Sequence, residues 1–100
     1  MIYITQLIFV KEGKEEMFLE FENYAIPLME EYKGKIIYRI RPSKENFIDN
    51  NKEIPFEIHF ISFDSENDLN GFMKDTRRLN FIHLKNDSVK TMLLVKGEKL

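Results

Sequence analysis

Four apolar-rich segments of strand length predict four β-strands, in which successive side chains point to opposite faces. The segments are residues 2–10, 35–41, 55–65 and 89–96. A strand with one wet face should alternate apolar and polar residues. The first and third segments are apolar on both faces instead, so both faces of the predicted sheet are expected to be covered.

A helical period follows over residues 14–33. Apolar residues at spacings of three and four form the expected buried stripe: Met17, Phe21, Tyr24, Leu28 and Tyr32, widened by Phe18, Ala25 and Met29. The glutamates are assigned to the opposite side: Glu15, Glu16, Glu20, Glu22, Glu30 and Glu31. Pro27 predicts either a kink or a break into two helices. Gly34 is expected to end the helix in the left-handed conformation.

A second helix is predicted to begin after Ser65. Ser65 is a typical N-cap residue, and Asp68 follows three positions later in an approximate capping box. Residues 77–87 are expected to form a separate helical turn or a loop before the last strand. Residues 43–54 are rich in turn-forming residues and predict a loop.

The predicted order β-α-β-β-α-β is the ferredoxin-like order, an α+β class. We expect residues 1–100 to form a single domain in which two helices cover one face of a four-stranded antiparallel sheet. The opposite face is expected to carry Ile61 and Phe63 from the third strand. Soluble monomers seldom expose an apolar patch of this size, so we predict a homodimer through the sheet face.

Two segments, YAIPLMEEYKGKIIYRIRP (residues 24–42) and ISFDSENDLNGFM (residues 61–73), together with this order, resemble the dimeric α+β barrel superfamily. It includes antibiotic biosynthesis monooxygenase-like, EthD-like and NIPSNAP-like proteins. The run from Pro27 through Gly34 into Ile36 carries most of the resemblance. The resemblance implies a pocket between sheet and helices and a dimer through the sheets. Its members include oxygenases, isomerases, haem-degrading enzymes and ligand sensors, so it leaves the chemistry open.

The composition narrows the function further. A net charge of −2 lacks the basic excess of a general nucleic-acid binder, and the absence of cysteine excludes disulfides and thiolate chemistry. Haem-degrading members of the superfamily combine a histidine, an asparagine and a tryptophan. This chain has no tryptophan, and Gln6 is the only amide of the first strand, so haem degradation is not expected. No cofactor is predicted. No signal peptide or membrane segment is expected either, which favours a cytoplasmic protein.

Two histidines are the candidate catalytic bases. His59 lies among apolar residues in the third strand, and His83 lies in the segment 77–87. Each is a candidate general base. The alternative for His59 is a hydrogen-bonded histidine in the core or at the dimer interface, and the alternative for His83 is a surface or helix-cap residue. Their spacing matches no metal motif, so no metal site is predicted.

Arg39 and Arg41 are the candidate anion ligands, because two guanidinium groups on one strand face can clamp a carboxylate or phosphate. The alternative is that both side chains are solvated at an edge strand or pair with acidic residues of the first helix. Tyr38 is predicted on the opposite face of the strand. There it either offers its hydroxyl group to a pocket or is an amphipathic tyrosine of the core.

The second half of the chain is locally basic: Lys74, Arg77, Arg78, Lys85 and Lys90. This pattern predicts a solvated surface with ion pairs or, alternatively, an anion site near Arg77 and Arg78. The expected function is binding of a small, mostly apolar or anionic molecule between sheet and helices. The alternative is a cofactor-independent monooxygenase- or isomerase-like enzyme with a histidine base and Arg39 as the anion ligand.

Overall fold

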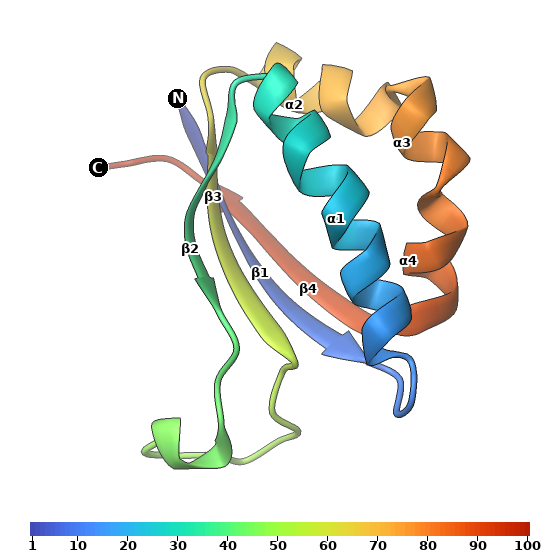
Figure 1. The fold of residues 1–100 in the computed structure, drawn as a ribbon. Coiled ribbons are helices and arrows are strands. Elements are labelled where there is room, and N and C mark those ends of the chain that lie inside the picture. The colour runs from blue at the N-terminus through green and yellow to red at the C-terminus, as the bar shows by residue number, and fades with distance from the viewer.

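The fold is a four-stranded sheet with one helical layer, seen in a computed structural model that describes residues 1–100. The elements are β1 (Ile2–Val10), α1 (Glu15–Glu31), β2 (Gly34–Ile40), a short 3₁₀ turn (Lys44–Asn46), β3 (Glu57–Phe63), α2 (Glu66–Lys74), α3 (Thr76–Asn80), α4 (Ile82–Ser88) and β4 (Val89–Gly97). Figure 1 shows α1 and the α2–α4 segment on the same face of the sheet. The predicted α+β, ferredoxin-like architecture is confirmed, and residues 77–87 are helical, in α3 and α4.

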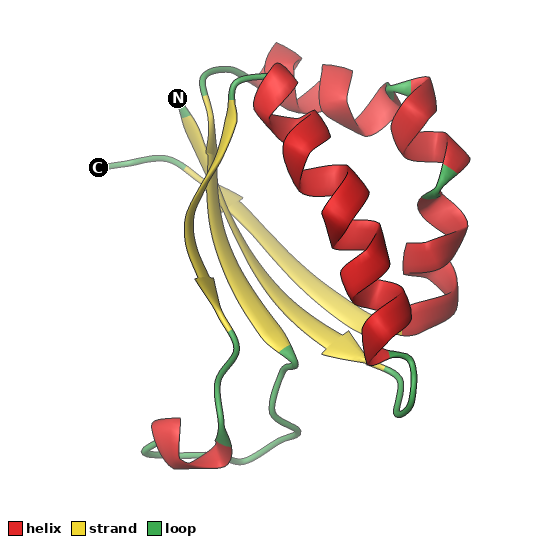
Figure 2. Ribbon diagram, in the orientation of Figure 1, coloured by secondary structure: helices red, strands yellow, loops and turns green.

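The strand order is β2-β3-β1-β4, and every neighbouring pair is antiparallel (Figure 2). In the β1–β3 pair, Ile4 lies opposite Ile61 and Gln6 lies opposite His59. Paired residues share a face of the sheet. The register therefore places these four side chains together under the helices.

The phase of β3 differs from the prediction. Ile61 and Phe63 are buried beneath the helical layer, so their expected place on the opposite face was wrong. Because both faces of this strand are apolar, periodicity alone could not select the phase. The face away from the helices, called the outer face below, carries Ile58 and Phe60 from β3.

An irregularity in β2 also changes which side chains share a face. The register with β3 shifts between Ile36 and Tyr38, which is typical of a β-bulge. Ile36 pairs with Ile61 and Arg39 pairs with His59, so Ile36 and Arg39 both face the helices. Strict alternation had placed them on opposite faces.

Helix α1 runs without a break from Glu15 to Glu31 and contains Pro27, so the alternative of two helices was wrong. Proline removes the bond to the carbonyl of Asn23, which lies four residues earlier. Both residues are exposed, and water can hydrate this carbonyl. The predicted buried stripe is confirmed at Phe18, Phe21, Ala25, Leu28 and Met29. Its edges differ from the prediction, since Glu22 is buried and Tyr24 is 51% exposed.

Gly34 does not act as a left-handed cap. Lys33 takes the positive φ of 62° that ends this segment. A Cβ atom on Gly34 would overlap Cγ of Met29 and lie 2.7 Å from Cε1 of Phe63. Glycine is therefore required here for close packing of α1 on the sheet. The N-cap prediction for Ser65 is confirmed, because its Oγ accepts a hydrogen bond from the amide of Asp68.

The outer face of the sheet is apolar and partly exposed, with three aromatic rings in a row across it. Tyr3 and Tyr38 both stack on Phe60, with ring centroids 5.6 and 6.3 Å away. The apolar side chains of this face are Tyr3, Leu7, Phe9, Tyr38, Ile40, Ile58, Phe60, Leu93 and Val95. No helix is both long enough and apolar enough to span a lipid bilayer.

Candidate functional site

A cavity of about 90 Å³ lies between the sheet and the helices. Thirteen of its 18 lining residues are hydrophobic. The sheet contributes Ile4, Ile36, Ile61 and Phe63, and the helices contribute Phe21, Ala25, Met29, Leu69 and Phe72. Met73 and Leu94 also line the cavity and are exposed, so it reaches the surface beside them. We call it the sheet–helix cavity.

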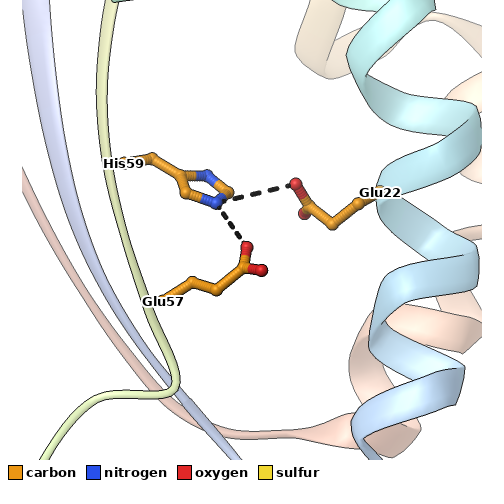
Figure 3. A group of neighbouring side chains, drawn as sticks. All are labelled: Glu22, Glu57 and His59. Carbon is orange, nitrogen blue, oxygen red and sulfur yellow. Dashed lines mark hydrogen bonds and ion pairs between the residues drawn. The ribbon is translucent and has the colours of Figure 1, made fainter. Parts of the chain in front are cut away.

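One part of the cavity wall is polar. Gln6 of β1 and His59 of β3 lie opposite each other on the sheet. Glu22 points from α1 toward His59 (Figure 3). Nε2 of His59 is 3.8 Å from Oε2 of Glu22 and 2.8 Å from Oε1 of Glu57. The imidazole is thus held between two carboxyl groups, one from the sheet and one from a helix.

Glu57 is a buried carboxylate with three cationic or hydrogen-bonding neighbours. Arg39 Nε lies 3.1 Å from its Oε1, and Arg41 Nη2 donates to Oε2. Burial by itself would raise the pKa of Glu57, but the hydrogen bonds from His59, Arg41 and Arg39 outweigh burial and lower the pKa to about 2. Glu57 is therefore ionised at neutral pH, and its single negative charge is shared between the two arginines.

Glu22 behaves in the opposite way. Burial raises its pKa, and the charges of His59 and Arg39 only partly oppose this effect. Burial thus favours the protonated carboxyl group, which can donate a hydrogen bond into the cavity. With Glu57 ionised, Nε2 of His59 is the ring nitrogen that donates to Oε1 of Glu57.

The three residues also form a potential metal-binding group, since Glu22, Glu57 and His59 each offer one ligand atom within 4.8 Å of the others. However, two guanidinium groups already bind the carboxylate of Glu57. A divalent cation would have to compete with both. The arrangement therefore fits an internal hydrogen-bonded ion cluster better than a cation site.

Two further cations line the cavity from the helical side, Arg78 of α3 and Lys85 of α4. Arg78 is only 7% exposed, and its guanidinium group lies 5.3 Å from the ring centroid of Phe72. Its one hydrogen bond goes from Nη1 to the carbonyl of Met73, and its buried Nε has no partner. Neither cation takes part in an ion pair.

The structure brings only one of the five predicted site residues to the cavity, namely His59. Arg39 and Arg41 face the same side of the sheet but bind Glu57. Tyr38 lies on the outer face and is 62% exposed. His83 is exposed on α4 and does not line the cavity.

Glu22 is a site residue that the sequence analysis assigned to the solvated side of the helix. A usable signal was present: Glu22 lies four residues after Phe18 and three before Ala25, and both of these are buried. A carboxylate at that spacing falls on the apolar face. Arg78 was considered together with Arg77, but Arg77 pairs with Asp75 and Glu31 at the surface.

Known proteins resemble this chain in structure. No protein-family model and no curated protein matches the sequence. A protein of unknown function from Rhodopseudomonas palustris superposes with a TM-score of 0.85 at 13% identity, over 99% of this chain and 82% of that one. A candidate antibiotic biosynthesis monooxygenase from Nitrosomonas europaea gives 0.73 at 14% identity, over 100% and 99%.

A ferredoxin-like protein of unknown function from Bacteroides fragilis, described as dimeric, gives 0.70 at 12% identity, over 98% of this chain and 95% of that one. The predicted resemblance in fold to antibiotic biosynthesis monooxygenase-like and NIPSNAP-like proteins is confirmed. At these identities the likeness concerns the fold and does not extend to activity.

Proposed function

We propose that this protein binds a small, mostly apolar molecule in the sheet–helix cavity. The observation that supports this most strongly is the cavity itself, which is largely hydrophobic and has a few converging polar groups at Gln6, Glu22 and His59. Such a lining is typical of small-molecule sites. The volume of about 90 Å³ is small for such a site, and the opening beside Met73 and Leu94 is where the rest of a longer ligand would extend. The apolar wall provides affinity, and the polar groups orient one polar end of the ligand.

Methyl NMR of methionine tests this proposal. Met29, Met73 and Met92 line the cavity, whereas Met1 and Met17 do not. Titration with hexan-1-ol, octan-1-ol and decan-1-ol should shift the first three methyl signals in a saturable way and leave the other two unchanged. If no alcohol of this series shifts the three lining methyl groups, the proposed function is wrong.

The second part of the proposal is a homodimer through the outer face. Its support is the row of stacked aromatic rings there, the exposed Ile40, Leu93 and Val95, and the dimeric description of one protein of similar fold. Burying this surface against a second copy would remove it from water.

Light scattering coupled to gel filtration tests the dimer. Leu93→Glu changes a side chain that is already exposed in the single chain and should give a monomer of 12.0 kDa. The matched control is Leu79→Glu, which changes an equally exposed leucine on the helical side and should leave a dimer. A monomeric parent protein would contradict this part of the proposal.

A general base at His59 is the second candidate function. It is supported by the imidazole held between two carboxyl groups beside an apolar cavity, because a fixed imidazole in such a site can take a proton from carbon. In the Kemp elimination of 5-nitrobenzisoxazole, the base takes the C3 proton while the N–O bond breaks to give a cyanophenolate. His59→Asn should slow this reaction at least about tenfold, and His83→Asn should not. Equal rates for the parent and His59→Asn would exclude this candidate.

A further inference from the structure

Arg78 is a buried cation with no anionic partner. Its guanidinium group forms one long hydrogen bond, 3.4 Å from Nη1 to the carbonyl of Met73, and its Nε has none. A buried charge without a counter-ion is costly. The ring of Phe72 offsets part of this cost through a cation–π contact. Because this contact uses the face of the guanidinium group, it does not satisfy the N–H donors at its edge.

Lys85 adds a second cation to the same cavity. It is half-buried, and its pKa is lowered by burial and by the charge of Arg78, although Glu22 opposes this effect. The lining thus holds two cations and one carboxyl group, Glu22, whose protonated form burial favours. Nearby, the carboxylate of Glu57 pairs with Arg39 and Arg41, and because these two side chains are 36% and 53% exposed, solvent screens the positive charge that remains.

We propose that the sheet–helix cavity selects an apolar molecule with one anionic group, a carboxylate for example, and that Arg78 and Lys85 bind this group. The inference rests on the proposed function and adds the charge of the ligand. An anion would satisfy the free guanidinium donors and remove the repulsion between the two cations. The anion site therefore lies on the helical side of the cavity and does not involve Arg39, which is bound to Glu57.

Matched acids and alcohols test the inference. Octanoate and octan-1-ol have the same apolar body, and an apolar cavity without a cation would prefer the alcohol because a carboxylate loses more hydration. Isothermal titration calorimetry should show octanoate binding at least about tenfold more tightly than octan-1-ol. The methyl signals of Met29, Met73 and Met92 should report both ligands at the same place.

Arg78→Met should remove most of the preference for octanoate while leaving the affinity for octan-1-ol within about twofold. Arg77→Met is the matched control, because it deletes the same charge one residue away, outside the cavity, and should keep the preference. Lys85→Met is a second variant in case Arg78→Met does not fold, and it should weaken octanoate binding alone.

The outcomes separate the two proposals. Equal binding of acid and alcohol, or an undiminished preference in Arg78→Met, would overturn the anion site and leave the apolar cavity as the function. Binding of neither ligand at the lining methionines would overturn the proposed function, and the anion site with it. The comparison of acid and alcohol on the parent protein decides the question even if both variants fail to fold.

Discussion

His59 and Glu57 lie two residues apart on the same face of β3, and Nε2 of His59 is 2.8 Å from Oε1 of Glu57. The same carboxylate accepts hydrogen bonds from Arg39 of β2 and from Arg41, which directly follows this strand. One buried anion thus fixes the imidazole at the wall of the cavity and holds two arginines at the edge strand. The four ionisable side chains on this part of the sheet, namely Glu57, His59, Arg39 and Arg41, thus depend on one another. A fifth ionisable group, Glu22, approaches His59 from α1.

Replacement of Glu57 by glutamine should destabilise the protein by about 2–3 kcal/mol. This value is below the usual cost of breaking a buried ion pair, because both arginines are partly exposed and water can solvate them. An amide cannot neutralise two guanidinium groups. Urea unfolding of Glu57→Gln against the parent measures the effect. Glu53→Gln, which removes an exposed partner of Lys90, is the control and should cost less than about 0.5 kcal/mol. Equal costs for the two variants would contradict the role assigned to Glu57.

The ion cluster also predicts a loss of stability in acid. The pKa of Glu57 falls from 4.5 to about 2 on folding. A lowered pKa contributes stability that is fully present above pH 4.5 and is lost as the pH falls toward 2. The difference in unfolding free energy between the parent and Glu57→Gln should therefore shrink between pH 5 and pH 2. A difference that stays constant over this interval would show that the carboxylate is not held in its ionised form.

Glu22 predicts the opposite dependence on pH. Because burial raises its pKa, the protonated form stabilises the fold below pH 4.5, and this contribution is lost as the pH rises through the folded-state pKa. Glu22→Gln should therefore gain on the order of 1 kcal/mol relative to the parent at pH 8, and little at pH 4. Thermal unfolding at both pH values measures this. Glu20→Gln, an exposed position on the same helix, should show no such dependence, and a parallel response of the two variants would contradict the prediction.

Close packing at Gly34 makes a fourth prediction. Gly34→Ala should destabilise the fold by about 1–3 kcal/mol, because the added Cβ overlaps Met29 and Phe63. Gly97→Ala is the control, since nothing lies within 4 Å of a Cβ there. Denaturant unfolding of both variants checks the difference. A neutral Gly34→Ala would mean that α1 shifts on the sheet without cost.

Part of the site could be predicted from the sequence. His59 stood out as one polar ring in an apolar strand, and the structure places it at the cavity. The basic segment pointed to Arg77 and Arg78 together, but only Arg78 is buried. The two differ because α3 turns one side chain toward the cavity and the other toward Asp75 and Glu31. Adjacent residues on a helix point in different directions, so a local charge count cannot separate them.

The sequence by itself determined the order of strands and helices, the N-cap at Ser65 and the fold class, because these depend on local periodicity and capping. Only the tertiary structure decided which face of β3 meets the helices and how the bulge in β2 turns Arg39 toward Glu57. It also decided that Glu22 is buried. A strand that is apolar on both faces satisfies either phase equally well, and the choice depends on how the register and the helical layer pack together.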